Sequence, residues 1–444
     1  METWSEITDA VIFLGVLALI ATERLHLTIA AFLGAMLLIF LHVLTLDQAI
    51  GYIGYSHATL ALFFGVMVMV RAFEPTNIFA YLATQMVLMA RGEGKRLLLG
   101  IVAITTPICA VLPNATTVML LAPLIPPMAA ELNVNVVPLL ILMVFVANSA
   151  GLLTLVGDPA TFIVGDSINL SFWDYLFQMS LGGVIAIATI VVMLPLLFPH
   201  TWNKTLDDLD HLPRPQVNHP RMLVLGGFVV ALVLVMFVVG DSLPVPISPA
   251  AIALLGAALC LLLTHHSGID TVQNILRDVD WSTLVFFMSV FVLIGGLQET
   301  GVISQAAGLL GGVIGQNIAL GAMLLLFVTG ILSSLIPNIP LVVAMVPLVK
   351  EYLVNANLAG SELLSPDFAG QVPAEILPLF AAMMFGATLG GNGTLVGASS
   401  NIVAAGIAEQ HGKPISFRLF LSYGLPLMSL QLVVISIYVG VRFL

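Results

Sequence analysis

The sequence has little of the charge that a water-exposed surface requires. Only 8% of its 444 residues are charged, whereas a soluble globular protein carries about 25%. Hydrophobic residues make up 59% of the chain, and the mean hydropathy is +1.10. This composition predicts an integral protein of the cell inner membrane, embedded in the lipid bilayer. The net charge of −11 gives no sign of a nucleic-acid partner, because the acidic residues lie mostly in predicted loops.

Cysteine is equally scarce, and so are the motifs of cofactor chemistry. Cys109 and Cys260 both fall inside apolar stretches, which gives no disulfide framework. No cationic segment precedes the first apolar run near Ala10, so this run is predicted to be a retained helix and not a signal peptide. We expect no cofactor and no metal. The sequence has no nucleotide-binding loop, so any ATPase drive would come from a cytoplasmic partner protein.

What the chain does have is an internal repeat. A shift of 224 residues lays 57–123 over 281–347 without a gap, and it aligns Pro113-Asn114 with Pro337-Asn338. A shift of 240 residues then aligns the TLVG segments at 154–157 and 394–397. The repeat predicts a first unit at 1–200, a polar linker at 201–220 and a second unit at 221–444.

Each unit has five apolar segments of adequate length to span a membrane. They are expected at 9–25, 27–44, 57–73, 136–165 and 175–199, and again at 222–240, 249–264, 281–297, 376–407 and 419–441. Each unit has a further apolar stretch, 98–130 or 318–349, with Pro-Asn near its middle. Proline removes a backbone donor and ends the preceding turn. We therefore predict two re-entrant hairpins with Pro-Asn at their tips; one long kinked helix is the alternative.

Because five is an odd number, the second unit must be inverted relative to the first. The basic residues support this, since ten lie on one side of the deduced topology and only Lys350 and Arg442 on the other. The predicted fold is an all-α polytopic membrane protein of two inverted repeats, with the linker cytoplasmic and both termini outside. The ten are Arg24, Arg91, Lys95, Arg96, Lys204, Arg214, Arg221, Arg277, Lys413 and Arg418.

The stretch GGNGTLVGASSNIVAAG at 390–406 places glycine, asparagine and serine where a membrane helix favours leucine and valine. Irregular backbone at membrane depth is tolerated only where protein or a water-filled cavity satisfies its N–H and C=O groups. We therefore predict a broken helix at 376–407 and its repeat mate at 136–165. Paired broken helices in inverted repeats are typical of secondary transporters and not of enzymes. Small residues that allow close helix packing are the alternative explanation.

These segments resemble the ion transporter superfamily. The likeness rests on FGATLGGNGTLVGASSNIVAAGIAEQHG, WSTLVFF, PNIPLVVAMVP and VGDPATFIVG, and it is closest to the branch of the arsenite efflux permeases and the melanosomal P protein. The resemblance implies scaffold and transport bundles, a homodimer and elevator-like movement. It also implies a site at the hairpin tips and broken helices, which here correspond to Asn114, Asn338, Gly157-Asp158 and the run Asn392–Asn401.

Two departures from this family pattern bear on the coupling ion. Relatives commonly have Leu-Asp-Asn at each hairpin tip, whereas this chain has Leu112-Pro113-Asn114 and Ile336-Pro337-Asn338. The relatives' Gly-Asp-Pro-Pro-Asn is replaced by Gly157-Asp158-Pro159-Ala160-Thr161. A hard cation such as sodium prefers several oxygen ligands, usually with a carboxylate. The missing acids therefore argue against classical sodium/proton exchange.

The predicted site consists of amides, hydroxyls and one carboxyl group. The lining favours a small neutral polyhydroxyl solute over a polyanion, because its segments contain no Lys, Arg or His. We therefore predict efflux of arsenite or antimonite by proton antiport. Asp158 is the predicted proton-coupling residue, and a helix cap with Pro159 at the first helical position is its alternative role. The predicted substrate-binding residues are Asn114, Thr116, Thr117, Asn148, Ser149, Asn338, Asn392, Gly393, Thr394, Ser399 and Ser400.

Other functions remain as alternatives. A sodium/proton antiporter or a citrate or dicarboxylate carrier would fit the same superfamily, and a channel could use the same fold. An intramembrane hydrolase would need a metal motif, a Ser-His pair or a second intramembrane aspartate. Asp158 has no such acidic mate in another motif. A thiol–arsenic contact at Cys109 has little support, because cysteine is commonly a buried core residue.

Overall fold

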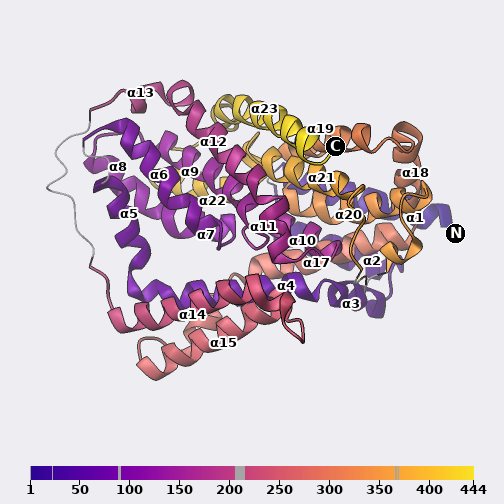
Figure 1. The fold of residues 1–444 in the computed structure, drawn as a ribbon, viewed down its shortest axis with the longest axis horizontal. Coiled ribbons are helices and arrows are strands. Elements are labelled where there is room, and N and C mark those ends of the chain that lie inside the picture. The colour runs from indigo at the N-terminus through magenta and orange to yellow at the C-terminus, as the bar shows by residue number, and fades with distance from the viewer. Residues whose placement is uncertain (1, 23, 89–91, 206–215, 366–367, 369) are drawn as a thin grey trace.

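The computed structural model describes residues 2–22, 24–88, 92–205, 216–365, 368 and 370–444, and its regular elements are helices (Figure 1). Within these ranges no strand occurs, apart from an isolated bridge between Glu93 and Thr205. Arg91, Arg214 and half of the predicted linker, residues 206–215, lie outside the described residues. The all-α class predicted from the sequence is confirmed.

The helices of the first half begin near the N-terminus and end before the linker. They are α1 (Glu2–Ala21), α2 (Leu27–Phe40), α3 (Leu46–Tyr55), α4 (His57–Phe73), η1 (Glu74–Thr76), α5 (Ile78–Leu88), α6 (Gly94–Cys109), α7 (Asn114–Leu121), η2 (Ala122–Leu124), α8 (Ile125–Glu131), α9 (Val136–Ala150), η3 (Gly151–Leu153), α10 (Pro159–Ser167), α11 (Phe172–Gln178), α12 (Ser180–Leu197) and α13 (Pro199–Trp202).

The helices of the second half follow the linker and end at the C-terminus. They are α14 (Pro220–Val239), η4 (Gly240–Ser242), α15 (Pro249–Ser267), α16 (Val272–Arg277), α17 (Trp281–Glu299), α18 (Val302–Ile314), α19 (Ile318–Leu335), α20 (Asn338–Asn355), η5 (Ser361–Leu364), α21 (Leu377–Gly390), η6 (Leu395–Gly397), α22 (Ser399–Gln410) and α23 (Phe417–Arg442).

The order of elements recurs. Two long helices, a short one and a long one open each half, from α1 to α4 and from α14 to α17. A further helix and a pair broken at Pro-Asn follow, then an interrupted helix and a last long helix. Both chain ends lie toward the right of the view in Figure 1, whereas α13 lies toward the left.

Ten helices among the described residues are long and apolar enough to cross a membrane, which confirms a polytopic membrane protein. They differ from the ten spans expected from the sequence. Helices α2 and α21 have only 14 residues, whereas both arms of the second predicted hairpin, α19 and α20, have 18. At 1.5 Å per residue an 18-residue helix is about 27 Å long, so length alone does not distinguish a hairpin arm from a span. Both arms pack against α21.

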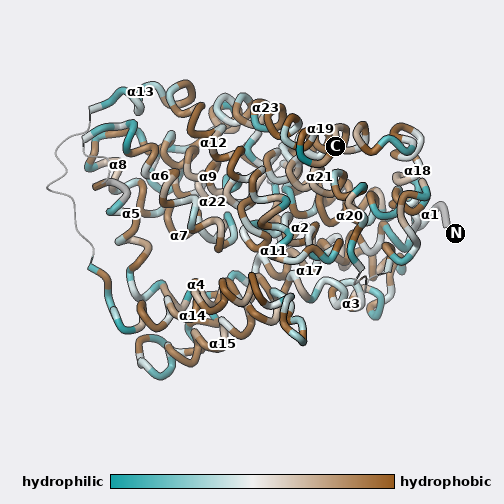
Figure 2. Tube along the Cα trace, viewed as in Figure 1, coloured by the Kyte–Doolittle hydropathy of each residue, from teal (hydrophilic) through white to brown (hydrophobic). Residues whose placement is uncertain are grey.

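The interrupted helices lie in the centre of the molecule. All 14 residues of α21 are buried, and so are nearly all residues of α9. The outer helices are exposed instead, since only 22% of the α14 span and 17% of the α1 span are buried. Many of the exposed residues of α14 are nonetheless large and hydrophobic, such as Phe228 and Val235, and Figure 2 shows this helix as mostly hydrophobic. The polar breaks are therefore surrounded by protein, as the sequence analysis predicts.

The two halves interlock through matched pairs of helices. Helix α4 packs against α15, and α17 packs against α2. A Cβ atom on Gly65 would lie only 2.6 Å from the backbone carbon of Ala253, so glycine allows α4 and α15 to approach closely. The interrupted helices cross over as well, because α10 packs against α20 and α21, whereas α22 packs against α7 and α9.

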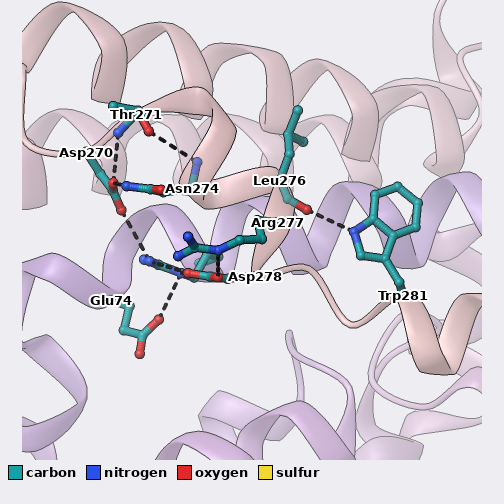
Figure 3. A network of polar contacts seen from close by, with 9 residues as sticks. Glu74, Asp270, Thr271, Asn274, Leu276, Arg277, Asp278 and Trp281 are labelled. Atoms are coloured by element: carbon teal, nitrogen blue, oxygen red, sulfur yellow. Dashed lines mark hydrogen bonds and ion pairs between the residues drawn. The ribbon is translucent and has the colours of Figure 1, made fainter.

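An ion-pair network joins the halves at the end of α4 (Figure 3). The Arg71 guanidinium lies 2.8 Å from Asp278, 3.2 Å from Asp270 and 3.2 Å from Glu74. Arg277 also donates to Asp278. Arg277 and Arg71 lower the pKa of Asp278 below its usual range through these hydrogen bonds. Arg71 is therefore paired with three acidic residues at the end of α4.

Four short helices lie between the segments expected to span the membrane: α3, α5, α16 and α18. They have between 6 and 13 residues. Segments of that length are too short to span a membrane, so a search for membrane-spanning runs does not detect them. Local capping defines some of them. Thr45 and Gln48 form a capping box at the start of α3, and the Thr271 hydroxyl accepts a hydrogen bond from the Asn274 backbone N–H at the start of α16.

Candidate functional site

Each Pro-Asn step ends one helix and starts the next. Pro113 has φ −54° and ψ 141°, and Pro337 has φ −52° and ψ 141°. This extended conformation turns the chain, and Asn114 and Asn338 then become the first residues of α7 and α20. Both asparagines are only 5% exposed. Two turns of the same shape therefore present two buried amides.

The helix breaks also adopt one backbone conformation twice. Thr154 and Thr394 are extended, with φ −138° and −137°, at matching places after α9 and α21. Four residues further on, Asp158 and Ala398 are extended again, with φ −144° and −146°, before α10 and α22 begin. The two TLVG segments thus connect the proximal and distal halves of two interrupted helices.

The residues of TLVG attach each break to the hairpin of its own half. The Thr154 hydroxyl donates to the Ala110 carbonyl, and the Thr394 hydroxyl donates to the Ser334 carbonyl. The glycine allows close approach, since a Cβ atom on Gly157 would lie 2.8 Å from the Cys109 carbonyl oxygen. A Cβ atom on Gly397 would lie 2.9 Å from the Ser333 carbonyl oxygen in the same way.

Asp158 lies where both Pro-Asn turns meet the first break. Its side chain is completely buried. The Asn114 amide donates to Oδ1 at 3.0 Å, and the Asn338 amide donates to Oδ1 and Oδ2 at 3.4 and 3.3 Å. Oδ2 also accepts from the Ala160 backbone N–H at 3.1 Å, so Asp158 caps α10 with Pro159 next to it. The predicted capping role is confirmed, and the same carboxyl group contacts both turns.

Asn148, near the end of α9, connects the first half to the second break. Its oxygen accepts from the Asn114 amide at 3.2 Å and from the Ser400 hydroxyl at 2.6 Å. Its nitrogen donates to the side-chain oxygens of Asn392 and Asn401, both at 3.1 Å. Every hydrogen-bonding position of this amide is therefore used, which holds its orientation firmly.

The second break is held by the last helix. The Asn392 amide donates to Gln431 of α23 at 2.9 Å and to Ser149 at 3.1 Å. Gln431 donates in turn to the Ser149 hydroxyl at 3.0 Å and to the Ala186 carbonyl of α12 at 3.1 Å. The Asn401 amide donates to the Gly391 and Thr394 carbonyls at 2.8 and 2.9 Å, which satisfies two backbone groups of the break.

We call these connected side chains the central polar network. It has a single ionisable member, Asp158, and the rest are amides and hydroxyls. All nine members are at most 5% exposed. They are Asn114, Asn148, Ser149, Asp158, Asn338, Asn392, Ser400, Asn401 and Gln431.

Most of the predicted site residues meet in this network, but not all. Thr394 anchors the break to α19, and Gly393 packs its carbonyl close to Gly424 of α23. Thr117 is completely buried. Thr116 and Ser399 are partly exposed and do not belong to the network. The role of each of these residues in solute binding remains a prediction.

Two members of the network are absent from the residues predicted from the sequence. Asn401 appeared only as the end of a polar run. Gln431 was missed altogether, although a lone glutamine inside a 26-residue apolar helix is a signal of a buried polar contact. Thr388 lies 240 residues after Asn148, at the matching place in the repeat, and its side chain is buried.

The glycines of the second break also serve packing. A Cβ atom on Gly390 would clash with the Gly330 carbonyl of α19, so this glycine lets α21 lie close against α19. The alternative explanation by close packing therefore holds for such glycines. It does not account for Asn392 and Asn401, whose amides form the network.

Comparison with known proteins agrees with this architecture. Residues 17–366 match the family described as CitMHS, citrate transporter. An uncharacterized transporter of Synechocystis is 68% identical over 429 residues, which cover 97% of this chain and 96% of that protein. The human P protein is 30% identical over 529 residues, which cover 100% of this chain and 60% of that longer protein.

A solved structure shows the same fold at lower identity. The crystal structure of the YdaH transporter of Alcanivorax borkumensis, described as having an unusual topology, matches with a TM-score of 0.60 and 13% identity. The match covers 89% of this chain and 87% of that one. The resemblance to the P protein and its superfamily, predicted from the motifs, is confirmed. The chain belongs to the citrate transporter family, CitMHS, of the ion transporter superfamily, and it is a multi-pass membrane transporter.

Proposed function

We propose that this transporter exports a small uncharged polyhydroxyl solute, arsenous or antimonous acid, in exchange for protons through an elevator-like movement. One observation carries the proposal. The only ionisable side chain of the central polar network, Asp158, accepts hydrogen bonds from the asparagine of each Pro-Asn step. A change of charge at this carboxyl group acts on both turns at once.

The coupling step follows from the strength of those hydrogen bonds. A carboxylate accepts hydrogen bonds that are roughly twice as strong as those between neutral groups. The ionised Asp158 therefore holds Asn114 and Asn338 together, whereas a protonated Asp158 holds them less firmly. In the proposed cycle a proton entering from outside neutralises Asp158, and the loosened turns exchange their contacts with solute.

The chemistry of the network supports a neutral solute. Amides and hydroxyls supply both donors and acceptors, which suits a molecule whose hydroxyl groups do the same. A buried carboxylate without a nearby cation repels an anion, and no Lys, Arg or His belongs to the network. A solute that enters replaces amide–amide contacts with amide–hydroxyl contacts of similar strength.

Citrate is the second candidate, because the description of the matching family names a citrate transporter. To bind this trianion, the network would need Asp158 to be protonated. Backbone N–H groups at the starts of α7, α10, α20 and α22 would have to bind the carboxylates of citrate. Transport of citrate would therefore need a bound cation or a proton with each turnover.

Purified protein in proteoliposomes tests the two candidates side by side. Uptake of arsenite, antimonite, citrate and sodium is measured with and without an imposed pH gradient, against liposomes without protein. We expect arsenite and antimonite to accumulate only when the gradient is present, and citrate and sodium to remain at background. Accumulation of citrate or sodium in place of the neutral acids would overturn the proposal.

A further inference from the structure

One cavity with a polar lining lies outside the central polar network. It has a volume of about 620 Å³, and its walls belong to α3, α4, α10, α17 and α20, together with residues after η5. These helices come from both halves of the chain. In Figure 1 the region of α3 and the end of α17 lies toward the side that carries both chain ends.

Two helices connect the cavity with the network. Helix α10 begins just after Asp158 and α20 begins at Asn338, and both helices then line the cavity. The lining residues nearest to the network on these helices are Ile163 and Val343, each five residues further along. Five residues of helix rise by roughly 7.5 Å, so only a short apolar segment separates cavity and network. Both side chains are less than a tenth exposed.

The charges in the cavity have no counterpart in the repeat. Asp166 corresponds to Gly406 at the shift of 240, whereas Lys350 and Glu299 correspond to Pro126 and Pro75 at the shift of 224. The matching elements of the other half therefore form without charge at these positions. Asp166 and Glu299 contribute two carboxylates to the lining, and Lys350 contributes one ammonium group. The lining therefore has a formal net negative charge. The Tyr52 hydroxyl donates to Glu299 at 3.0 Å and holds that carboxylate at the wall.

We propose that this cavity is a water-filled entrance to the transport site, and that Asp166 and Lys350 determine which charged species enter it. Water and small cations or neutral molecules are admitted from the side of residues 361–365, and polyanions are disfavoured. This inference needs no particular transported solute, because it concerns access to the protein from one side.

Cysteine labelling in sealed vesicles tests the entrance. Val346 lines the cavity, and Leu234 lines a separate apolar groove of about 300 Å³ between α4, α5, α6 and α14. Val346→Cys and Leu234→Cys are treated with a cationic and an anionic methanethiosulfonate, both unable to cross membranes. The native cysteines are completely buried. We expect Val346→Cys to react from one side only, faster with the cationic reagent, and Leu234→Cys to remain unmodified.

The role of the Asp166 and Lys350 charges is tested by adding further substitutions to the Val346→Cys variant. Asp166→Asn should lower the ratio of cationic to anionic rates roughly tenfold, and Lys350→Gln should raise it by a similar factor. Asp47→Asn, an exposed change on α3 away from the cavity lining, should leave the ratio unchanged. If Val346→Cys resists both reagents yet reacts after denaturation, the cavity is not an entrance. A ratio that neither Asp166→Asn nor Lys350→Gln alters would refute the role of the charges. Neither result depends on which solute is transported.

Discussion

At the scale of single residues, Asp158 combines a local and a long-range role. One oxygen caps α10 through the Ala160 N–H, and the pair of oxygens accepts from amides 44 and 180 residues away in the chain. Asparagine retains a capping oxygen but cannot change its charge. The two roles can therefore be separated by one substitution.

We expect Asp158→Asn to fold and to exchange solute across the membrane, but not to accumulate it when a pH gradient is imposed. The measurement compares counterflow of labelled solute with proton-driven uptake in the same proteoliposomes. Asp47→Asn serves as the control, because Asp47 is exposed on α3. Full proton-driven accumulation by Asp158→Asn would show that Asp158 is only a helix cap.

The asparagines of the network should divide into two classes. Asn114 and Asn338 donate to a carboxylate, and loss of such a bond is worth about 1.5–3 kcal/mol. Asn114→Ala and Asn338→Ala should therefore slow transport about 10- to 100-fold while the protein remains folded. Asn401→Ala leaves two buried carbonyls without their donor, so it should chiefly lower the unfolding temperature in detergent. Equal effects of all three substitutions on unfolding and transport would contradict this division.

At the scale of elements, the interrupted helices are defined by their contact with the hairpin behind them. The glycine of each TLVG segment lies against a backbone carbonyl of α6 or α19, and a threonine three residues earlier bonds to the same region. Both halves use this arrangement. It explains why a short motif recurs unchanged while the surrounding apolar residues differ.

Gly157→Ala and Gly397→Ala should therefore each abolish transport, and both should lower the unfolding temperature. A Cβ atom would lie within 3 Å of two backbone carbonyl oxygens at either position, and backbone cannot move aside cheaply. Gly227→Ala in α14 is the matched control, because no atom lies within 4 Å of its added Cβ. In an exposed helix this control should be neutral or slightly stabilising. Normal transport by Gly157→Ala would show that the break does not need this close contact.

At the scale of the whole molecule, the two halves are joined because each packs one of its helices against the other half. Each distal half-helix packs against the Pro-Asn pair of the other half, α10 on α20 and α22 on α7. Asp158 therefore contacts a turn of each half. A transport movement that separates the turns must alter both halves together, which is consistent with the proposed elevator-like movement.

If the halves have the inverted orientation predicted from the sequence, single cysteines should react from defined sides of the membrane. Asn203→Cys and Lys95→Cys should be labelled only from the cytoplasm, whereas Ser361→Cys should be labelled only from outside. All three positions are exposed. Lys95 is preferable to its neighbour Gly94, where a Cβ atom would clash with the Thr201 carbonyl. Labelling of all three from one side would refute the inverted topology.

The sequence by itself determined the features that depend on local chemistry. Scarcity of charge predicted the membrane class, the Pro-Asn steps predicted the turns, and TLVG predicted the breaks. Proline and glycine constrain the backbone wherever they occur, so these predictions needed no knowledge of neighbours. The short helices were not predicted, because they are neither long enough to span a membrane nor apolar throughout.

Only the tertiary structure decided which polar groups meet. Gln431 bonds to Ser149 across 282 residues, and Asn338 bonds to Asp158 across 180. The pattern of apolar residues along the sequence cannot predict such pairs, because the packing of α10 and α22 against the opposite halves determines which side chains meet. The cavity charges Asp166 and Lys350 likewise belong to one wall only after folding. The repeat could show where the two units match, whereas the central polar network lies where α10 and α22 pack against the opposite halves.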